Sequence, residues 1–235
     1  MNKLLFPCVV LAGCVAAEVA AASPATPISL PRIPRPAHPN AALAQALARW
    51  DRQQASKLAE CKRQVAEHNA RQRRGDAAEA RYELAYKVLL DSAQVYSVRY
   101  DIDTDCAGAH PDVERGGVAF ETQTGKPYDA AQLYRVGQPA KDGGTALAPD
   151  VRERVRDKLF QARATARGVD DCIDVLKQDP IEYADALALG RDGLHVFVSG
   201  IHVAQACYGP VVLRYESLRD YLDPAEAARL QWVRK

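Results

Sequence analysis

The sequence lacks an excess charge of either sign, a metal-binding spacing and the motifs of common hydrolases. Its 235 residues carry 31 lysines and arginines against 30 aspartates and glutamates. Such a balance gives no field that would attract a nucleic acid or an anionic membrane. There is no Cys-x-x-Cys, no His-Glu-x-x-His and no nucleophile-elbow spacing. We therefore expect no nucleic-acid partner, no cofactor and no metal, and we favour a binding protein over an enzyme.

The apolar run at the start is too short to cross a bilayer, which takes about 20 residues. It covers Leu4 to Leu11, follows a positive Met1-Asn2-Lys3 and ends in Leu11-Ala12-Gly13-Cys14, which resembles a lipobox. We assign residues 1–22 to a lipoprotein-type signal segment, with Cys14 as the lipidated residue. The alternative is soluble export with cleavage after Ala22. Both alternatives predict a periplasmic location. In the lipidated form we expect membrane attachment only through the lipid on Cys14, at the outer membrane.

Four further cysteines form an even set, Cys61, Cys106, Cys172 and Cys207. In an oxidising compartment such a set predicts two disulfides, although a sequence cannot choose among the three possible pairings. We expect Cys61 to pair with Cys172, joining two helices, and Cys106 to pair with Cys207, joining two loops. A zinc site is the alternative, but the cysteines and histidines lack ligand spacing.

Proline and helix-forming residues divide the first part of the chain. Residues 23–40 contain six prolines, which predicts an extended spacer that suits a tether. Asn40 can cap a long helix reaching about Arg74, and residues 41–80 form a helical extension. Its apolar stripe, interrupted by Gln54, consists of Leu43, Leu47, Trp50, Leu58, Cys61 and Val65.

Residues 81–222 mix strand and helix patterns. Two alternating runs, 81–90 and 96–102, predict a hairpin, although Asp76 and Glu79 could open a helix through the first run instead. A short strand is expected at 118–122, and helices at 149–168 and 171–177.

The end of the chain alternates again at 194–199 and 211–215, around the turn 206–210. We expect Ser217 to cap a helical turn after it. We also expect a final helix within 223–235, capped by Asp223 and with Pro224 at its first position. The predicted fold class is α+β, with a mixed or mostly antiparallel sheet, helices packed on one side and a long N-terminal helix.

Several motifs occur in a recognisable order. They are Ala107-Gly108-Ala109-His110-Pro111, Phe120-Glu121-Thr122-Gln123-Thr124-Gly125-Lys126, Asp192-Gly193-Leu194, Gly209-Pro210 and Tyr215-x-x-Leu218-x-x-Tyr221-Leu222. From Arg81 to Leu222 the chain resembles the RsiV-like family of extracytoplasmic domains. It departs from the family at Ala107, where a second glycine is usual, and at Ile201-His202. The resemblance implies an α+β domain of the cell envelope, tied to peptidoglycan or lysozyme.

The function expected from these features is binding in the cell envelope. The candidate binding residues lie in two loops, Gly108, Ala109, His110 and Pro111 in one and Tyr208, Gly209 and Pro210 in the other. Rigid loops with such side chains make anchors at low entropic cost. The resemblance implies a lysozyme-type hydrolase or a peptidoglycan fragment as the partner, recognised or inhibited there. Two alternatives stay open, a structural lipoprotein and a peptidoglycan-modifying enzyme using Asp101, Asp103, Asp105, His110 and Asp112.

Overall fold

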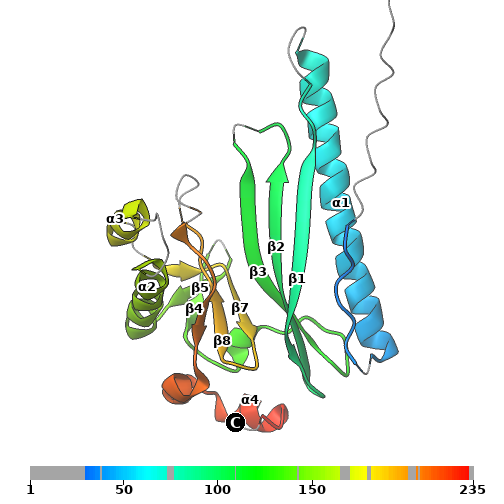
Figure 1. Cartoon of the computed structure of the whole chain (residues 1–235). Helices are drawn as coiled ribbons and strands as arrows, with labels where there is room; N and C mark the ends of the chain where they lie inside the picture. The colour runs from blue at the N-terminus through cyan, green and yellow to red at the C-terminus, as the bar shows by residue number, and fades with distance from the viewer. Residues whose placement is uncertain are drawn as a thin grey trace, which may run out of the picture.

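Three small antiparallel sheets and a long N-terminal helix make up the fold (Figure 1), which confirms the predicted α+β class. The computed structural model describes residues 30–37, 39–72, 77–108, 110–141, 143–164, 170–178, 181–200, 205 and 207–232. The expected signal segment, Cys14, Ala109 and Ile201-His202 lie outside these residues. Among the described residues, no helix is both long and apolar enough to traverse a bilayer.

The long helix α1 runs from Ala41 to Arg71 and begins where predicted. The Asn40 side chain accepts a hydrogen bond from the Leu43 backbone N–H at 2.8 Å, which confirms the cap. Gln54 does not interrupt the packed face, because its side chain is buried and accepts a hydrogen bond from the Tyr82 hydroxyl at 3.0 Å. A buried amide is tolerated when it is paired in this way.

Part of the predicted spacer is folded onto the domain. Ile33 is 1% exposed and packs among Leu47 and Phe120. The Ile33 N–H donates to Asp51 Oδ1 at 2.8 Å, and the Tyr96 hydroxyl donates to the Pro34 carbonyl at 2.7 Å. Residues 30–37 thus use their extended backbone to dock on α1 and on the strands beside it.

The first sheet has the order β1-β2-β3, from strands β1 (Arg81–Asp91), β2 (Val95–Asp105) and β3 (Asp112–Glu121). The predicted hairpin is therefore confirmed, and the helix alternative for 81–90 is wrong. β3 begins six residues before the predicted Val118, and its first half is polar and lies at a sheet edge. Polar, glycine-containing edge residues carry little hydrophobic alternation, so the pattern missed them.

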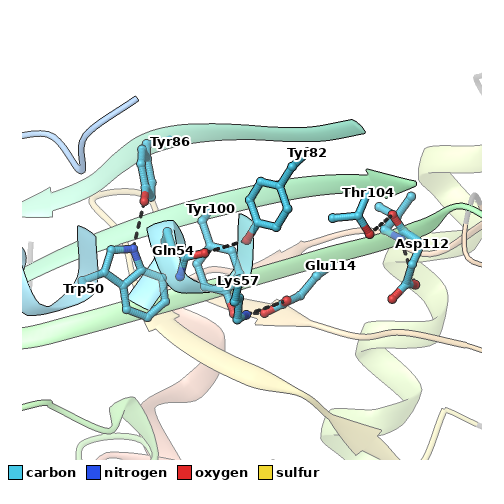
Figure 2. Close-up of polar contacts among 10 residues, drawn as sticks. Trp50, Gln54, Lys57, Tyr82, Tyr86, Tyr100, Thr104, Asp112 and Glu114 are labelled. Atoms are coloured by element: carbon cyan, nitrogen blue, oxygen red, sulfur yellow. Dashed lines mark hydrogen bonds and ion pairs between the residues drawn. The ribbon is translucent and has the colours of Figure 1, made fainter. Parts of the chain in front are cut away.

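A row of polar side chains joins α1 to one face of this sheet (Figure 2). Trp50 Nε1–H donates to the Tyr86 hydroxyl at 3.0 Å, and the Lys57 ammonium lies 3.0 Å from Glu114 on β3. The Tyr100 hydroxyl also donates to Glu114, at 2.9 Å. Burial raises the pKa of Tyr86 to about 12, so its phenol stays neutral. These contacts hold the helix along the length of the three strands.

The remaining elements form a second lobe. Its helices and 3-10 turns are η1 (Ala130–Gln132), α2 (Pro149–Ala164), α3 (Asp170–Gln178), η3 (Tyr215–Tyr221) and α4 (Pro224–Arg229). Its strands are β4 (Gly137–Pro139), β5 (Thr145–Leu147), β6 (Tyr183–Ala184), β7 (Ala186–Leu189), β8 (Leu194–Phe197) and β9 (Val211–Leu213). The predicted helices near 149 and 171 and the strands near 194 and 211 are confirmed.

Two helix caps near the C-terminus have different outcomes. Asp223 accepts from the Glu226 N–H at 2.7 Å and Pro224 opens α4, as expected. Ser217 does not cap η3, because it lies inside that helix. The N-cap residue of η3 is Arg214, and no side chain caps it. The Ser217 hydroxyl instead donates to the Arg214 carbonyl at 2.7 Å.

The two lobes pack closely against each other at Gly117 on β3. A side chain at Gly117 on β3 would place its Cβ 2.5 Å from Ala188 on β7 and 2.9 Å from the Phe197 ring. The β7-β8-β9 sheet therefore packs on the face of the first sheet that α1 does not cover. The far part of β2 and β3 projects beyond this contact (Figure 1).

Candidate functional site

The turn between β2 and β3 carries the first group of predicted binding residues. Gly108, His110 and Pro111 are exposed at the end of the projecting strands. Ala107 has a φ of +58°, a left-handed conformation that costs a residue with a Cβ about 1 kcal/mol. Strained backbone concentrates at functional sites, so this turn is a candidate site on geometry as well as on sequence.

Both disulfides differ from the predicted pairing. Cys61 is bonded to Cys106 and Cys172 is bonded to Cys207, and no bridge joins Cys106 to Cys207. The prediction failed because pairing depends on which Cα atoms come within about 6 Å, a tertiary property. Each bridge ties one loop to one helix, since Cys61 lies on α1 and Cys172 on α3.

The second group of predicted residues lies after α3 and β8, and its aromatic member is not an anchor. Tyr208 is 3% exposed, and its ring lies so close to Gly200 that a Cβ there would be 2.0 Å from it. Tyr208 is therefore a core residue, which corrects its predicted role. Gly209 and Pro210 are partly exposed and stay available at the surface.

Two arginines fix the backbone of this second loop. The Tyr208 carbonyl accepts hydrogen bonds from Arg115 on β3 and from Arg163 on α2, both at 3.2 Å. Arg163 Nε also donates to the Cys207 carbonyl at 3.1 Å. Hydrogen bonds from charged donors are stronger than neutral ones, so the loop is held by more than its disulfide.

The two predicted loops lie side by side. Gln205 Nε2 donates to Asp112 Oδ1 at 3.1 Å, across 93 residues of sequence. The bond from Arg115 to the Tyr208 carbonyl is a second link between the same two segments. The exposed residues Gly108, His110, Pro111 and Asp112 and the partly exposed residues Gln205, Gly209 and Pro210 form what we call the paired-loop surface. Sequence reasoning gave no signal for Arg115, Arg163 or Gln205, because they are single polar residues outside any motif.

The acidic residues of the enzyme alternative do not converge. Side chains alternate faces along a strand, and paired residues of neighbouring strands share a face. Asp101 and Asp103 lie opposite Arg115 and Val113, whereas Asp112 lies opposite Thr104 on the other face. Asp101 is also engaged, with Arg99 at 2.7 Å and Arg115 at 3.7 Å. Among the described residues there is no group of three or more His, Cys, Asp or Glu that could hold a metal ion.

The histidine on strand β8 is hydrogen-bonded to a neighbouring side chain. His195 is 5% exposed, and its Nε2–H donates to Asp192 Oδ1 at 2.8 Å. It lies on β8, away from the paired-loop surface.

No family model matches the sequence, and no curated protein matches it either. Among solved structures, the chain is similar to a DUF3298 family protein from Pseudomonas aeruginosa PAO1. That match has a TM-score of 0.43 and 16% identity, and it spans 63% of this chain and 66% of the other. A DUF3298 family member from Bacteroides fragilis NCTC 9343 gives a TM-score of 0.46 and 11% identity, over 77% of this chain and 68% of the other.

The structural neighbours are thus DUF3298 family proteins, and neither is described as an RsiV-like domain. Similarities this low carry no argument about function. Membership of the RsiV-like family stays a prediction.

Proposed function

We propose that this chain is a cell-envelope binding module that recognises a lysozyme-type peptidoglycan hydrolase through the paired-loop surface. The observation that carries the proposal is the contact of two loops 93 residues apart, in which Gln205 donates to Asp112. Each of the two loops carries candidate binding residues on sequence grounds alone. A binding function gives a reason for their coming together at one exposed end of the molecule.

The rigidity of the two loops supports recognition. The disulfides of Cys106 and Cys207 anchor the loops to α1 and α3. Arg115 and Arg163 hold the backbone of the second loop by hydrogen bonds to the Tyr208 carbonyl. Loops that are already ordered lose little conformational entropy when a partner binds, and exposed His110 and Pro111 can then act as anchors. A fragment of peptidoglycan is the alternative ligand for the same surface.

The location of the protein forms part of the proposal. Two disulfides fit an oxidising, extracytoplasmic compartment, in which lysozyme-type hydrolases encounter the wall. We propose anchoring by lipid on Cys14, with soluble export after Ala22 as the alternative. Mass spectrometry of the mature N-terminus distinguishes a diacylglyceryl cysteine from a chain that begins at Ser23.

Calorimetric titration of the protein with a panel of lysozyme-type hydrolases and with peptidoglycan fragments tests the proposal. The double variant His110→Ala, Pro111→Ala should weaken binding at least tenfold, the usual effect of removing central anchors. Tyr183→Ala is the matched control, because Tyr183 is 53% exposed and lies on β6 in the second lobe. Binding to none of these probes, or equal affinity of the double variant and wild type, would contradict the proposal.

The enzyme alternative has its own measurement. If the protein released soluble fragments from purified peptidoglycan, and Asp112→Asn and His110→Ala abolished the release, the protein would be a wall-modifying enzyme and not a binding module. We expect no such release.

A further inference from the structure

A cavity lies at the end of the molecule opposite the paired-loop surface. It has a volume of about 660 Å³ and is bounded by the β1-β2 turn, the β7-β8 turn, η3 and the residues after α4. This volume is within the range of small-ligand sites, about 300–1,000 Å³. The β1-β2 turn and α4 lie at the lower end of the molecule in Figure 1.

One wall of the cavity is a fixed group of aromatic rings. Tyr215 stacks on Tyr134 with ring centroids 5.2 Å apart, and Trp232 meets Tyr215 edge-on at 5.6 Å. The Tyr215 hydroxyl donates to the Gly190 carbonyl at 2.7 Å, and Trp232 Nε1–H donates to the Tyr134 hydroxyl at 3.3 Å. Tyr215 and Trp232 line the cavity, so their rings are already held in place there.

The backbone beside this wall is strained. Gln231, which also lines the cavity, has a φ of +48°, a conformation that glycine adopts without steric cost. The Trp232 N–H donates to the Ala227 carbonyl at 2.8 Å, which fixes the chain after the strained residue. The strained residue immediately precedes Trp232, whose ring lines the cavity.

Acidic groups surround the aromatic wall. Asp91, Asp192 and Glu216 line the cavity together with one arginine, Arg191. Burial opposes ionisation of Asp192, but the hydrogen bond and charge of His195 outweigh it and the pKa of Asp192 is lowered. The charged side chains that line the cavity are three carboxylates and one guanidinium, which is an excess of negative charge.

We propose that this cavity binds a small organic cation, with a primary ammonium group held by the carboxylates and an apolar body against Tyr215 and Trp232. Ammonium groups form charge-assisted hydrogen bonds with carboxylates and are attracted to aromatic faces. The site is independent of the paired-loop function, because the two lie at opposite ends of β2. An amino sugar and an aliphatic diamine carry the same chemistry.

Calorimetric titration of the full chain with two matched pairs of probes tests the proposal. Glucosamine is compared with N-acetylglucosamine, and cadaverine with 1,5-pentanediol. We expect at least one amine to bind about tenfold or more tightly than its neutral partner, and its affinity to fall as salt is added. The pair that shows the difference identifies an amino sugar or an alkyl amine as the source.

Variants connect the binding to the cavity. Glu216→Gln keeps the shape of an exposed side chain and removes its charge. It should lower the affinity for the amine about tenfold. Glu182→Gln, an exposed residue outside the cavity, should leave the affinity unchanged. Equal binding of the amine and its neutral partner, no binding of either amine, or an unchanged affinity in Glu216→Gln would overturn the proposal.

Discussion

Gln205 donates a hydrogen bond to Asp112 over 3.1 Å and so joins a loop of the second lobe to the start of β3. Both side chains are at the surface, so the bond contributes little to stability, about 1 kcal/mol or less. Its consequence is geometric, because it sets the distance between the two halves of the paired-loop surface.

We expect Gln205→Ala and Asp112→Ala each to lower the affinity for the hydrolase partner while changing the free energy of unfolding by less than about 1 kcal/mol. A double-mutant cycle on binding measures their coupling, because the second substitution removes nothing once the bond is lost. Strictly additive losses would show that the two residues act separately. Gln64→Ala on an exposed part of α1 is the control.

The disulfides give a prediction about covalent structure. Proteolysis without reduction should yield peptides linking Cys61 to Cys106 and Cys172 to Cys207, identified by mass spectrometry. Loops of 45 and 35 residues predict that replacing either pair by alanine lowers the free energy of unfolding by about 3–4 kcal/mol. A peptide linking Cys61 to Cys172 would refute this arrangement.

The contact between the lobes predicts an intolerant glycine. Gly117→Ala should lower the free energy of unfolding by about 1–3 kcal/mol in urea denaturation, because its Cβ has no room beside Ala188. Gly209→Ala is the matched control, since the nearest atom to a Cβ there is on Arg163 at 4.0 Å. We expect the control to stay within about 0.5 kcal/mol of wild type. Equal effects of the two would contradict the close approach of the sheets.

The tyrosines of the first sheet predict loss of stability in base. Burial raises the pKa of Tyr82, Tyr86 and Tyr96 from 10.0 to about 12. Between these values the unfolded chain has lost phenolic protons that the folded chain keeps, so the free energy of unfolding falls as pH rises from 10 to 12. Below pH 10 the stabilisation that comes from these shifted tyrosine pKa values is fully present.

Tyrosinate absorbance during a pH titration, followed alongside circular dichroism, measures this effect. In Tyr86→Phe the free energy of unfolding should fall less steeply as pH rises. Ionisation of all tyrosines near pH 10 with the fold intact would show that these phenols are exposed.

The strained turn predicts a stabilising substitution. Ala107→Gly should raise the free energy of unfolding by about 0.5–1 kcal/mol, because glycine adopts a φ of +58° without steric cost. Thermal denaturation checks the direction. Ala119→Gly, a buried position on β3 without this strain, should be destabilising and serves as the contrast. A lower melting temperature for Ala107→Gly would remove the argument for strain.

Local signals in the sequence carried most of the secondary structure. Asn40, Asp223 and Pro224 marked helix ends because capping involves only neighbouring backbone groups. The β1-β2 hairpin followed from its alternation, and the cysteine count gave the number of bridges. Where a local signal was weak, as in the polar first half of β3, the prediction stopped short.

Identifying the candidate site required both the sequence and the tertiary structure. Its loops were found from glycine, proline and histidine in the chain, but their proximity rests on Gln205 and Asp112, 93 residues apart. Tyr208 looked like an anchor in sequence and is a core residue in space, because exposure is decided by what packs on a side chain. The cavity near Trp232 brings together the β1-β2 turn and the C-terminal segment, which no local pattern connects.

The sequence by itself determined the main helices, the strands with clear alternation, the even set of four cysteines and the candidate loops, since these depend on backbone propensity and residue type within a few positions. Only the tertiary structure decided which cysteines pair, which face each carboxylate of β2 and β3 occupies and which aromatic side chains reach the surface. These properties depend on contacts between residues tens of positions apart, whose free energies are set by packing of the whole domain.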